Sequence, residues 1–208
     1  MTAISSAKSH RERLFRKSRS FLRPLDIAQD FWVLWAAYDL DQTLISQGHA
    51  PVSFPNMKQG MKKDEFLTVL KIFAAAKSQI LLIEDDTKSF KAKRGPIGMV
   101  SLDNYGWRLE PWFDFFYWAT KRMKLRAVVS FLHMISHSRQ FGVCVVRVGE
   151  RDVNFCDHLV KKYELLRPAG RISHGRPDGA EFIYSTKCKG ASKARAAVPT
   201  LRDERAAA

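Results

Sequence analysis

The sequence predicts an α+β fold, in which helices flank a mixed, mainly antiparallel β-sheet. The first observation behind this prediction is the stretch 98–148, where two strand-like runs enclose a segment with helical spacing and form a βαβ unit. The second is that helical segments are interleaved with short apolar strands along the rest of the chain. With 208 residues, of which 46% are hydrophobic, the chain can bury one substantial core.

The first half of the predicted domain consists of a short strand, two helices and a long loop. We expect a strand over residues 21–25 and a helix over residues 27–40, with Asp26 as its N-cap. Apolar residues recur in this helix at the spacing of one helical face. Glycines and prolines break any period in residues 41–60, and a loop of this length is often functional. A second helix follows over residues 62–76.

The second half supplies most of the sheet. An apolar strand over residues 79–86 pairs with a strand over 97–104 through a polar, basic turn at 87–96. The central strand occupies residues 108–119 and is followed by a basic turn at 120–127. The remaining elements are a helix over 128–138, a strand over 141–148, a helix over 151–166 and two strands over 167–175 and 179–187, joined by the turn at 176–179.

The basic turn lies where the helix after the central strand is expected to begin. It carries Lys121, Arg122, Lys124 and Arg126. The free N–H groups and the positive end of the dipole favour an anion at a helix start, and these side chains add to the same potential. A phosphate-bearing ligand is therefore the first functional hypothesis.

The net charge of +14 is concentrated at the two ends of the chain. We expect a basic extension at residues 1–20, a folded domain at 21–187 and a flexible, Ala-rich basic tail at 188–208. Such charge attracts nucleic acid, anionic surfaces or acidic proteins. Ends that only solubilise the protein remain the alternative.

Several classes of protein and site do not fit the sequence. No apolar run approaches the roughly 20 residues of a membrane span. The first twenty residues have no apolar stretch after their charges, so we expect no signal peptide and a location on the cytoplasmic side. The three cysteines lack C-x-x-C spacing and no His/Cys/Asp cluster has ligand spacing, so neither a disulfide nor a metal site is expected.

Over residues 21–187 the order and lengths of the elements resemble the GNAT superfamily of N-acetyltransferases. Residues 22–31 (LRPLDIAQDF) are similar to the opening strand and helix of that family, and residues 111–127 to its central strand and pyrophosphate loop. Residues 152–166 resemble the helix that carries an Asn near its start and a Tyr near its end. The segment 112–132 looks closer still to a divergent branch found in tailed bacteriophages, whose members include virion-associated proteins.

This resemblance implies acetyl-coenzyme A as the acetyl donor and a primary amine as the acceptor. It further implies that backbone groups of Phe115, Phe116 and Tyr117 hold the pantetheine arm. The implied pyrophosphate turn consists of Arg122, Met123, Lys124, Leu125, Arg126 and Ala127. The family has a glycine in this turn, because a glycine lets backbone amides approach the phosphates closely. In this alignment Leu125 takes its place. Arg167-Pro168 likewise replaces the Gly-Phe that often follows the Tyr helix.

The resemblance also assigns catalytic roles. Tyr163 would protonate the departing thiolate, and Asn154 would orient the cofactor or a water. Glu110, at the start of the central strand, is the preferred general base, with Glu84 and Asp114 as the other carboxylates on or near the sheet. Each role has a structural alternative: core packing for Tyr163, helix capping for Asn154 and an exposed strand end for Glu110.

The sequence leaves three functions open. The departures in the phosphate turn and the charged ends favour a virion-associated structural protein of a bacteriophage, in which the acetyltransferase fold is catalytically degenerate. Its basic ends would dock on virion proteins, host proteins or DNA, in the virion or the host cytoplasm. The second function is an active acetyl-coenzyme A-dependent N-acetyltransferase acting on a host protein or a small amine. The third is a nucleic-acid-associated module.

Overall fold

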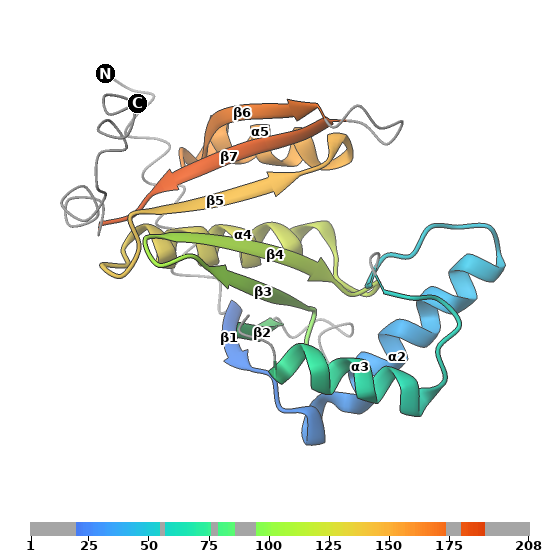
Figure 1. Cartoon of the computed structure of the whole chain (residues 1–208). Helices are drawn as coiled ribbons and strands as arrows, with labels where there is room; N and C mark the ends of the chain where they lie inside the picture. The colour runs from blue at the N-terminus through green and yellow to red at the C-terminus, as the bar shows by residue number, and fades with distance from the viewer. Residues whose placement is uncertain (1–19, 55–56, 76–78, 86–94, 174–179, 190–208) are drawn as a thin grey trace, which may run out of the picture.

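A computed structural model describes residues 20–54, 57–75, 79–85, 95–173 and 180–189. They form one seven-stranded sheet in the order β1-β2-β3-β4-β5-β7-β6, in which only β4 and β5 are parallel neighbours (Figure 1). The predicted α+β class, with its mixed and mainly antiparallel sheet, is confirmed. The strands are β1 (Ser20–Pro24), β2 (Gln79–Asp85), β3 (Gly98–Asn104), β4 (Arg108–Phe115), β5 (Val143–Val148), β6 (Arg167–Ser173) and β7 (Ala180–Lys187).

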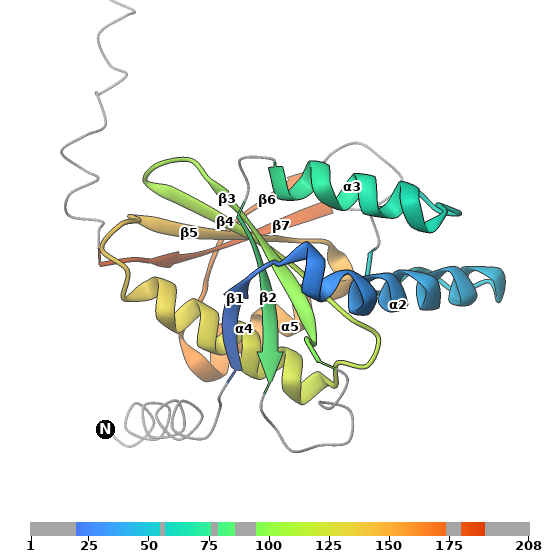
Figure 2. The same cartoon turned by 90° about the horizontal axis from the view of Figure 1, so that it is seen from below.

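Four α-helices of the described ranges cover the two faces of the sheet. They are α2 (Ile27–Ser46), α3 (Lys63–Ala75), α4 (Lys121–Ser136) and α5 (Val153–Tyr163), the last preceded by a short 3-10 turn, η2 (Glu150–Asp152). Figure 2 shows α2 and α3 on one side of the sheet and α4 and α5 on the other. One buried cluster joins α4 and α5 to the sheet, and a second joins α2 and α3 to β2, β3 and the segment after β4.

Parts of the predicted organisation lie outside the described residues. These are almost all of the basic extension at 1–20, nearly all of the tail at 188–208, most of the turn at 87–96 and the turn at 176–179.

Helix α2 begins as predicted, because the Asp26 carboxylate caps it by accepting from the N–H groups of Ala28 and Gln29. It continues to Ser46, six residues beyond the predicted end at residue 40. The extra turns have a structural use. The buried carboxylate of Asp41 accepts hydrogen bonds from the N–H groups of residues 52, 53 and 54 and so ties the following loop to the helix.

The segment after the central strand differs from the prediction. β4 ends at Phe115, not at residue 119, and α4 begins at Lys121, so residues 122–127 are helical and do not form a turn. Thr120 is the N-cap, and its hydroxyl oxygen accepts from the N–H of Met123 at 3.3 Å. Because Lys, Arg, Met and Leu are good helix formers, a run of them after a capping Thr continues the helix instead of breaking it.

Candidate functional site

The two parallel strands in the middle of the sheet separate from each other. β4 and β5 pair only through their first residues, Arg108 with Val143 and Leu109 with Cys144. Figure 1 shows the two arrows diverging toward their C-terminal ends. Ligands of sheets with parallel strands commonly bind at the carboxyl ends of those strands. The candidate site is therefore the divergence of β4 and β5.

Two backbone hydrogen bonds show which residues of β4 face β3. The N–H of Phe116 donates to the carbonyl of Ile97 at 3.0 Å, and the N–H of Tyr105 donates to the carbonyl of Arg108 at 2.9 Å. Bonded and non-bonded pairs alternate along an antiparallel ladder. The even-numbered residues of β4 therefore bond to β3, and the odd-numbered residues direct their N–H and C=O groups toward β5.

Beyond Leu109, the odd-numbered residues of β4 are Pro111, Phe113 and Phe115. Within the described ranges, no strand pairs with this edge past Leu109. Pro111 suits such an edge because it has no N–H to leave unpaired. Phe113 and Phe115 therefore present backbone groups that an extended ligand can bind in the manner of an added strand.

The three residues predicted to bind the pantetheine arm differ in whether their backbone groups are free. Phe115 lies at the free edge, and the side chain of Tyr117 is 54% exposed in the turn that follows. Phe116 does not lie at this edge. Its N–H bonds to Ile97, its carbonyl accepts from the N–H of Ala119 at 2.8 Å, and its side chain is fully buried.

Close approach of two strands positions the end of β4. Gly98 of β3 lies opposite Phe115, and a Cβ on this glycine would stand 2.5 Å from the carbonyl oxygen of Asp114. A side chain at position 98 would push β3 away from the residues that border the divergence. This glycine is therefore part of the support of the site.

The N-terminus of α4 follows directly on β4 and is strongly basic. The side chains of Lys121 and Arg122 are exposed, and no acidic residue lies in the first turn. Cations at this position oppose the helix dipole, which stabilises anions there. A bound phosphate group would reverse this penalty, because it would neutralise the cations and accept from the N–H groups of the first turn.

The side chains of residues 122–127 do not all face a ligand. Arg122 is exposed, and Lys124 is half-buried with its ammonium 5.6 Å from the ring centroid of Phe115. Met123 and Ala127 are buried in the core, and Leu125 packs against it. The buried guanidinium of Arg126 bonds to Asp85 of β2 at 2.6 Å, so its positive charge is matched inside the fold.

Glu110 is not at an exposed strand end, which was the structural alternative to its role as a base. It is 4% exposed, and its carboxylate lies 3.0 Å from Nε of Arg108 and 3.2 Å from Nε of Arg147. Since Arg147 belongs to β5, this ion pair spans the two strands where they separate. The two guanidinium groups match the charge of this buried carboxylate and occupy its oxygens.

Asp114 is the carboxylate best suited to accept a proton. It lies on the same face of β4 as Glu110, two positions after Trp112 and next to the free backbone edge. In the described part of the chain, no cation or hydrogen-bond donor pairs with its side chain. Burial alone raises the pKa of Asp114 to about 6. Only its position on the sheet was apparent from the sequence, because the burial that tunes it comes from other elements.

The structure separates Tyr163 from the basic end of α4. Tyr163 is the last residue of α5 and is 2% exposed, and burial raises its pKa. The next residue, Glu164, lines a cavity together with Ser136, the last residue of α4. Arg122 is near the opposite end of this helix, 14 residues before Ser136 and therefore about 21 Å away along the helix axis. The structure therefore does not bring Tyr163 close to the basic N-terminus of α4.

Asn154 is exposed in the first turn of α5, which starts just after β5 ends. Asp152, and not Asn154, occupies the N-cap position of this helix. Asn154 therefore lies on the side of the molecule toward which β4 and β5 diverge.

In the ranges that the structure describes, no group of three or more His, Cys, Asp or Glu residues is arranged to hold a metal ion. Among the helices of those ranges, none combines the length and the hydropathy of a membrane span.

Solved structures with a similar fold include known and probable acetyltransferases. A probable acetyltransferase of the GNAT family from Chromobacterium violaceum has a TM-score of 0.58 at 14% identity, over 81% of this chain and 82% of that one. Spermidine N-acetyltransferase from Vibrio cholerae, solved with CoA and spermine, has a TM-score of 0.55 at 13% identity, over 84% and 98%. A chimera of that enzyme and hSSAT has a TM-score of 0.56 at 16% identity, over 85% and 98%.

No family model matches the sequence, and no curated protein matches it significantly. The similarity is therefore one of structure. The chain has the fold of the GNAT acetyltransferases, with the same mixed sheet and flanking helices that the sequence predicted.

Proposed function

We propose that the chain is an acetyl-coenzyme A-dependent N-acetyltransferase that acts on a primary amine. The observation that carries this proposal is the free edge of β4, which leads from the divergence of the strands to the basic N-terminus of α4. A flexible arm bound along that edge would place its phosphate groups at the helix start. The fold shared with acetyltransferases supports the same ligand.

The residues fit this ligand at both of its ends. The N–H groups of Phe113 and Phe115 would bind the amide groups of the pantetheine arm, as in a β-ladder. Lys121 and Arg122, together with the first-turn N–H groups of α4, would bind the pyrophosphate. Bound in this way, acetyl-coenzyme A supplies the acetyl group as an activated thioester.

Asp114 is the proposed general base. It would take a proton from the acceptor ammonium and so leave the free amine that attacks the thioester carbonyl. The C–S bond then breaks, and coenzyme A leaves as a thiolate that takes up the proton lost by the attacking nitrogen. A carboxyl with a pKa of about 6 is ionised at neutral pH yet basic enough to share a proton. Glu110 would hold β4 and β5 together through Arg147 and would not act as the base.

The glycine missing from the expected phosphate turn does not oppose this proposal. Leu125 lies in the second turn of α4, where a glycine would weaken the helix and no ligand needs close approach. The segment that turns the chain toward the helix is 116–120, which the sequence alignment did not identify. The virion-associated, nucleic-acid and localisation hypotheses stay predictions.

Calorimetric titration with acetyl-coenzyme A tests the proposal. We expect micromolar binding to the wild-type protein and none to the Arg122→Glu variant, since that change places a negative charge beside the pyrophosphate. An acidic residue in the first turn of a helix is favourable for the helix, so the variant should remain folded. Arg139→Glu, an exposed position beyond the other end of α4, is the matched control and should bind normally.

Either of two outcomes would contradict the proposal: no heat of binding from folded wild-type protein, or equal loss of binding in both variants. If binding is found, spermidine and a lysine-containing peptide are the first acceptors to assay. These two probes represent the small amines and the protein amines.

A further inference from the structure

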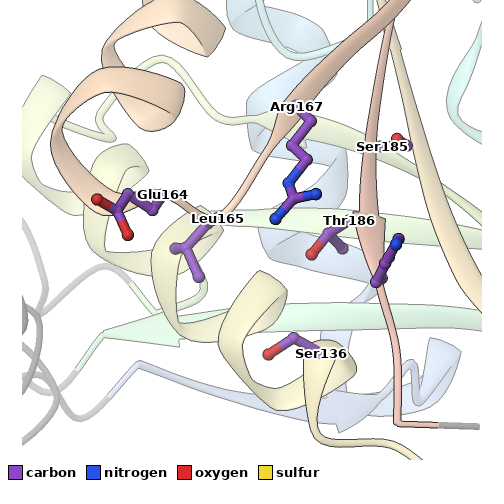
Figure 3. Close-up of a pocket in the computed structure, with 7 residues that line it drawn as sticks. Ser136, Glu164, Leu165, Arg167, Ser185 and Thr186 are labelled. Atoms are coloured by element: carbon purple, nitrogen blue, oxygen red, sulfur yellow. The ribbon is translucent and has the colours of Figure 1, made fainter.

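A polar cavity lies at the opposite end of α4 from the proposed acetyl-coenzyme A site. Its volume is about 180 Å³. Figure 3 shows it between the end of α4, the segment after α5 and the strands β6 and β7. It is lined by Ser136, Glu164, Leu165, Arg167, Ser185, Thr186 and Lys187.

One side of this cavity offers donors and positive charge. Arg167 and Lys187 are exposed at its mouth, and Thr186 is a buried hydroxyl below them. Figure 3 shows the guanidinium of Arg167 directed toward Thr186. Among the described residues, neither cation has a hydrogen bond or ion pair to an acidic side chain. A guanidinium fork, an ammonium and a hydroxyl together match the oxygens of a phosphate group.

The other side of the cavity offers acceptors. The hydroxyl of Ser136 donates to the carbonyl of His133 at 2.8 Å, and its oxygen lies 3.2 Å from Nδ1 of His137. A hydroxyl oxygen has two lone pairs, so at least one of them can accept from a ligand. Glu164 also lines the cavity, and Figure 3 shows its carboxylate directed away from Arg167. Glu164 has a left-handed backbone with φ of 53°, a conformation that is uncommon for residues other than glycine.

We infer that this cavity binds a small phosphate monoester whose organic part carries hydroxyl groups. The phosphate lies against Arg167, Lys187 and Thr186, whose two positive charges match the roughly −1.5 to −2 of a phosphate monoester. The hydroxyl groups donate to Ser136 and Glu164. The volume equals that of about six waters in the liquid, which suits a three-carbon phosphate and is below the range of drug-sized ligands.

This site is independent of the proposed acetyltransferase site. Ser136 is the last residue of α4, whereas Lys121 and Arg122 are in its first turn. Failure of one proposal therefore leaves the other unaffected, and the two sites can be titrated separately.

The test is a titration with glycerol 3-phosphate, followed by NMR amide shifts, with inorganic phosphate and glycerol as further probes. We expect saturable shifts at residues 136, 167 and 186 with glycerol 3-phosphate, weaker binding of phosphate and none of glycerol. Arg167→Gln and Lys187→Gln should each weaken binding about tenfold, the usual effect of losing one charge-assisted hydrogen bond. Lys161→Gln, which removes an exposed charge of α5 outside the cavity, should leave it unchanged.

The inference is overturned if no probe gives saturable shifts at these residues, or if glycerol binds as well as its phosphate. Equal weakening by Lys161→Gln would also overturn it, since the attraction would then come from overall charge. Unchanged amide spectra of the free variants outside the cavity show that they fold. Because two separate variants are used, the test remains valid if one of them does not fold.

Discussion

The two carboxylates on one face of β4 have opposite environments. Glu110, near the paired end of β4 and β5, lies between two arginines and is almost completely buried. Asp114, near the divergent end, has no cation beside it in the described part of the chain, and burial raises its pKa to about 6. The comparison shows that charge matching stabilises one end of the strand, whereas an unmatched carboxylate at the other end is available for chemistry.

The basic residues of α4 also divide into a charge-matched group and an unmatched group. Arg126, in the second turn of α4, is buried against Asp85. Lys121 and Arg122, one turn earlier, are exposed and oppose the helix dipole. A protein usually satisfies its buried charges, and unmatched charged groups close to one another indicate a binding or catalytic site.

The largest expected effect concerns the base itself. Asp114→Asn should reduce the rate of acetyl transfer by about 10²- to 10⁴-fold, because general-base catalysis contributes that much. In the wild-type protein, kcat/KM should rise with pH through about 6, where Asp114 loses its proton, and this step should be absent from the variant.

Initial rates of thiol release across a pH series check this prediction. Asp64→Asn, which removes an exposed carboxylate of α3, is the control and should retain wild-type rates. Retention of full activity by Asp114→Asn would remove Asp114 from the mechanism.

The same substitution should increase stability. The folded-state pKa of Asp114 is above the unfolded value, so the folded protein holds this proton more tightly and loses stability as pH rises through 6. Asp114→Asn should therefore be more stable than wild type at pH 8, by up to about 3 kcal/mol, and equally stable near pH 3. Denaturant unfolding at the two pH values measures the difference. A variant that is less stable at pH 8 would show that Asp114 has a stabilising partner.

Glu110→Gln, at the end of β4 that pairs with β5, should lower stability. It leaves Arg108 and Arg147 without their shared anion and should cost about 2 kcal/mol of unfolding free energy, reduced from the value for fully buried pairs because both arginines are partly exposed. The measurement is denaturant unfolding at pH 7. If Glu110→Gln instead abolished turnover while the protein remained fully folded, the roles assigned to the two carboxylates would be exchanged.

The smallest expected effect concerns the start of α4. Thr120→Ala removes the N-cap oxygen that accepts from Met123 and should cost about 1 kcal/mol. Thr68→Ala, in the exposed interior of α3, is the control and should change stability by less than about 0.5 kcal/mol. Comparable losses in the two variants would show that Thr120 does not act as a cap.

Much of the fold could be predicted from local patterns. The element order was correct throughout the described ranges, and Asp26 caps α2 as expected. The boundary between β4 and α4 was the main error, because an aromatic run continued past the strand and a basic run was interpreted as a turn. Apolar spacing cannot distinguish the end of a strand from the turn after it when both are buried. Phe116 and Trp118 are such buried turn residues.

The site was less predictable than the fold. The sequence indicated a phosphate-bearing ligand at the start of α4. It also placed Asp114 among the carboxylates on or near the sheet. The preference for Glu110 depended on its position at the start of a strand. Its two arginine partners are 2 and 37 residues away along the chain, and the second is close only because β5 lies beside β4.

The sequence by itself determined the order of strands and helices, the capping of α2, and the concentration of positive charge at the start of α4. These features depend on side chains within a few residues of one another. The tertiary structure alone decided that β4 and β5 separate after two pairs, that Phe113 and Phe115 border the gap, and that burial tunes Asp114 while arginines neutralise Glu110. The physical reason is that strand pairing and burial are long-range properties, which depend on segments brought together only by folding.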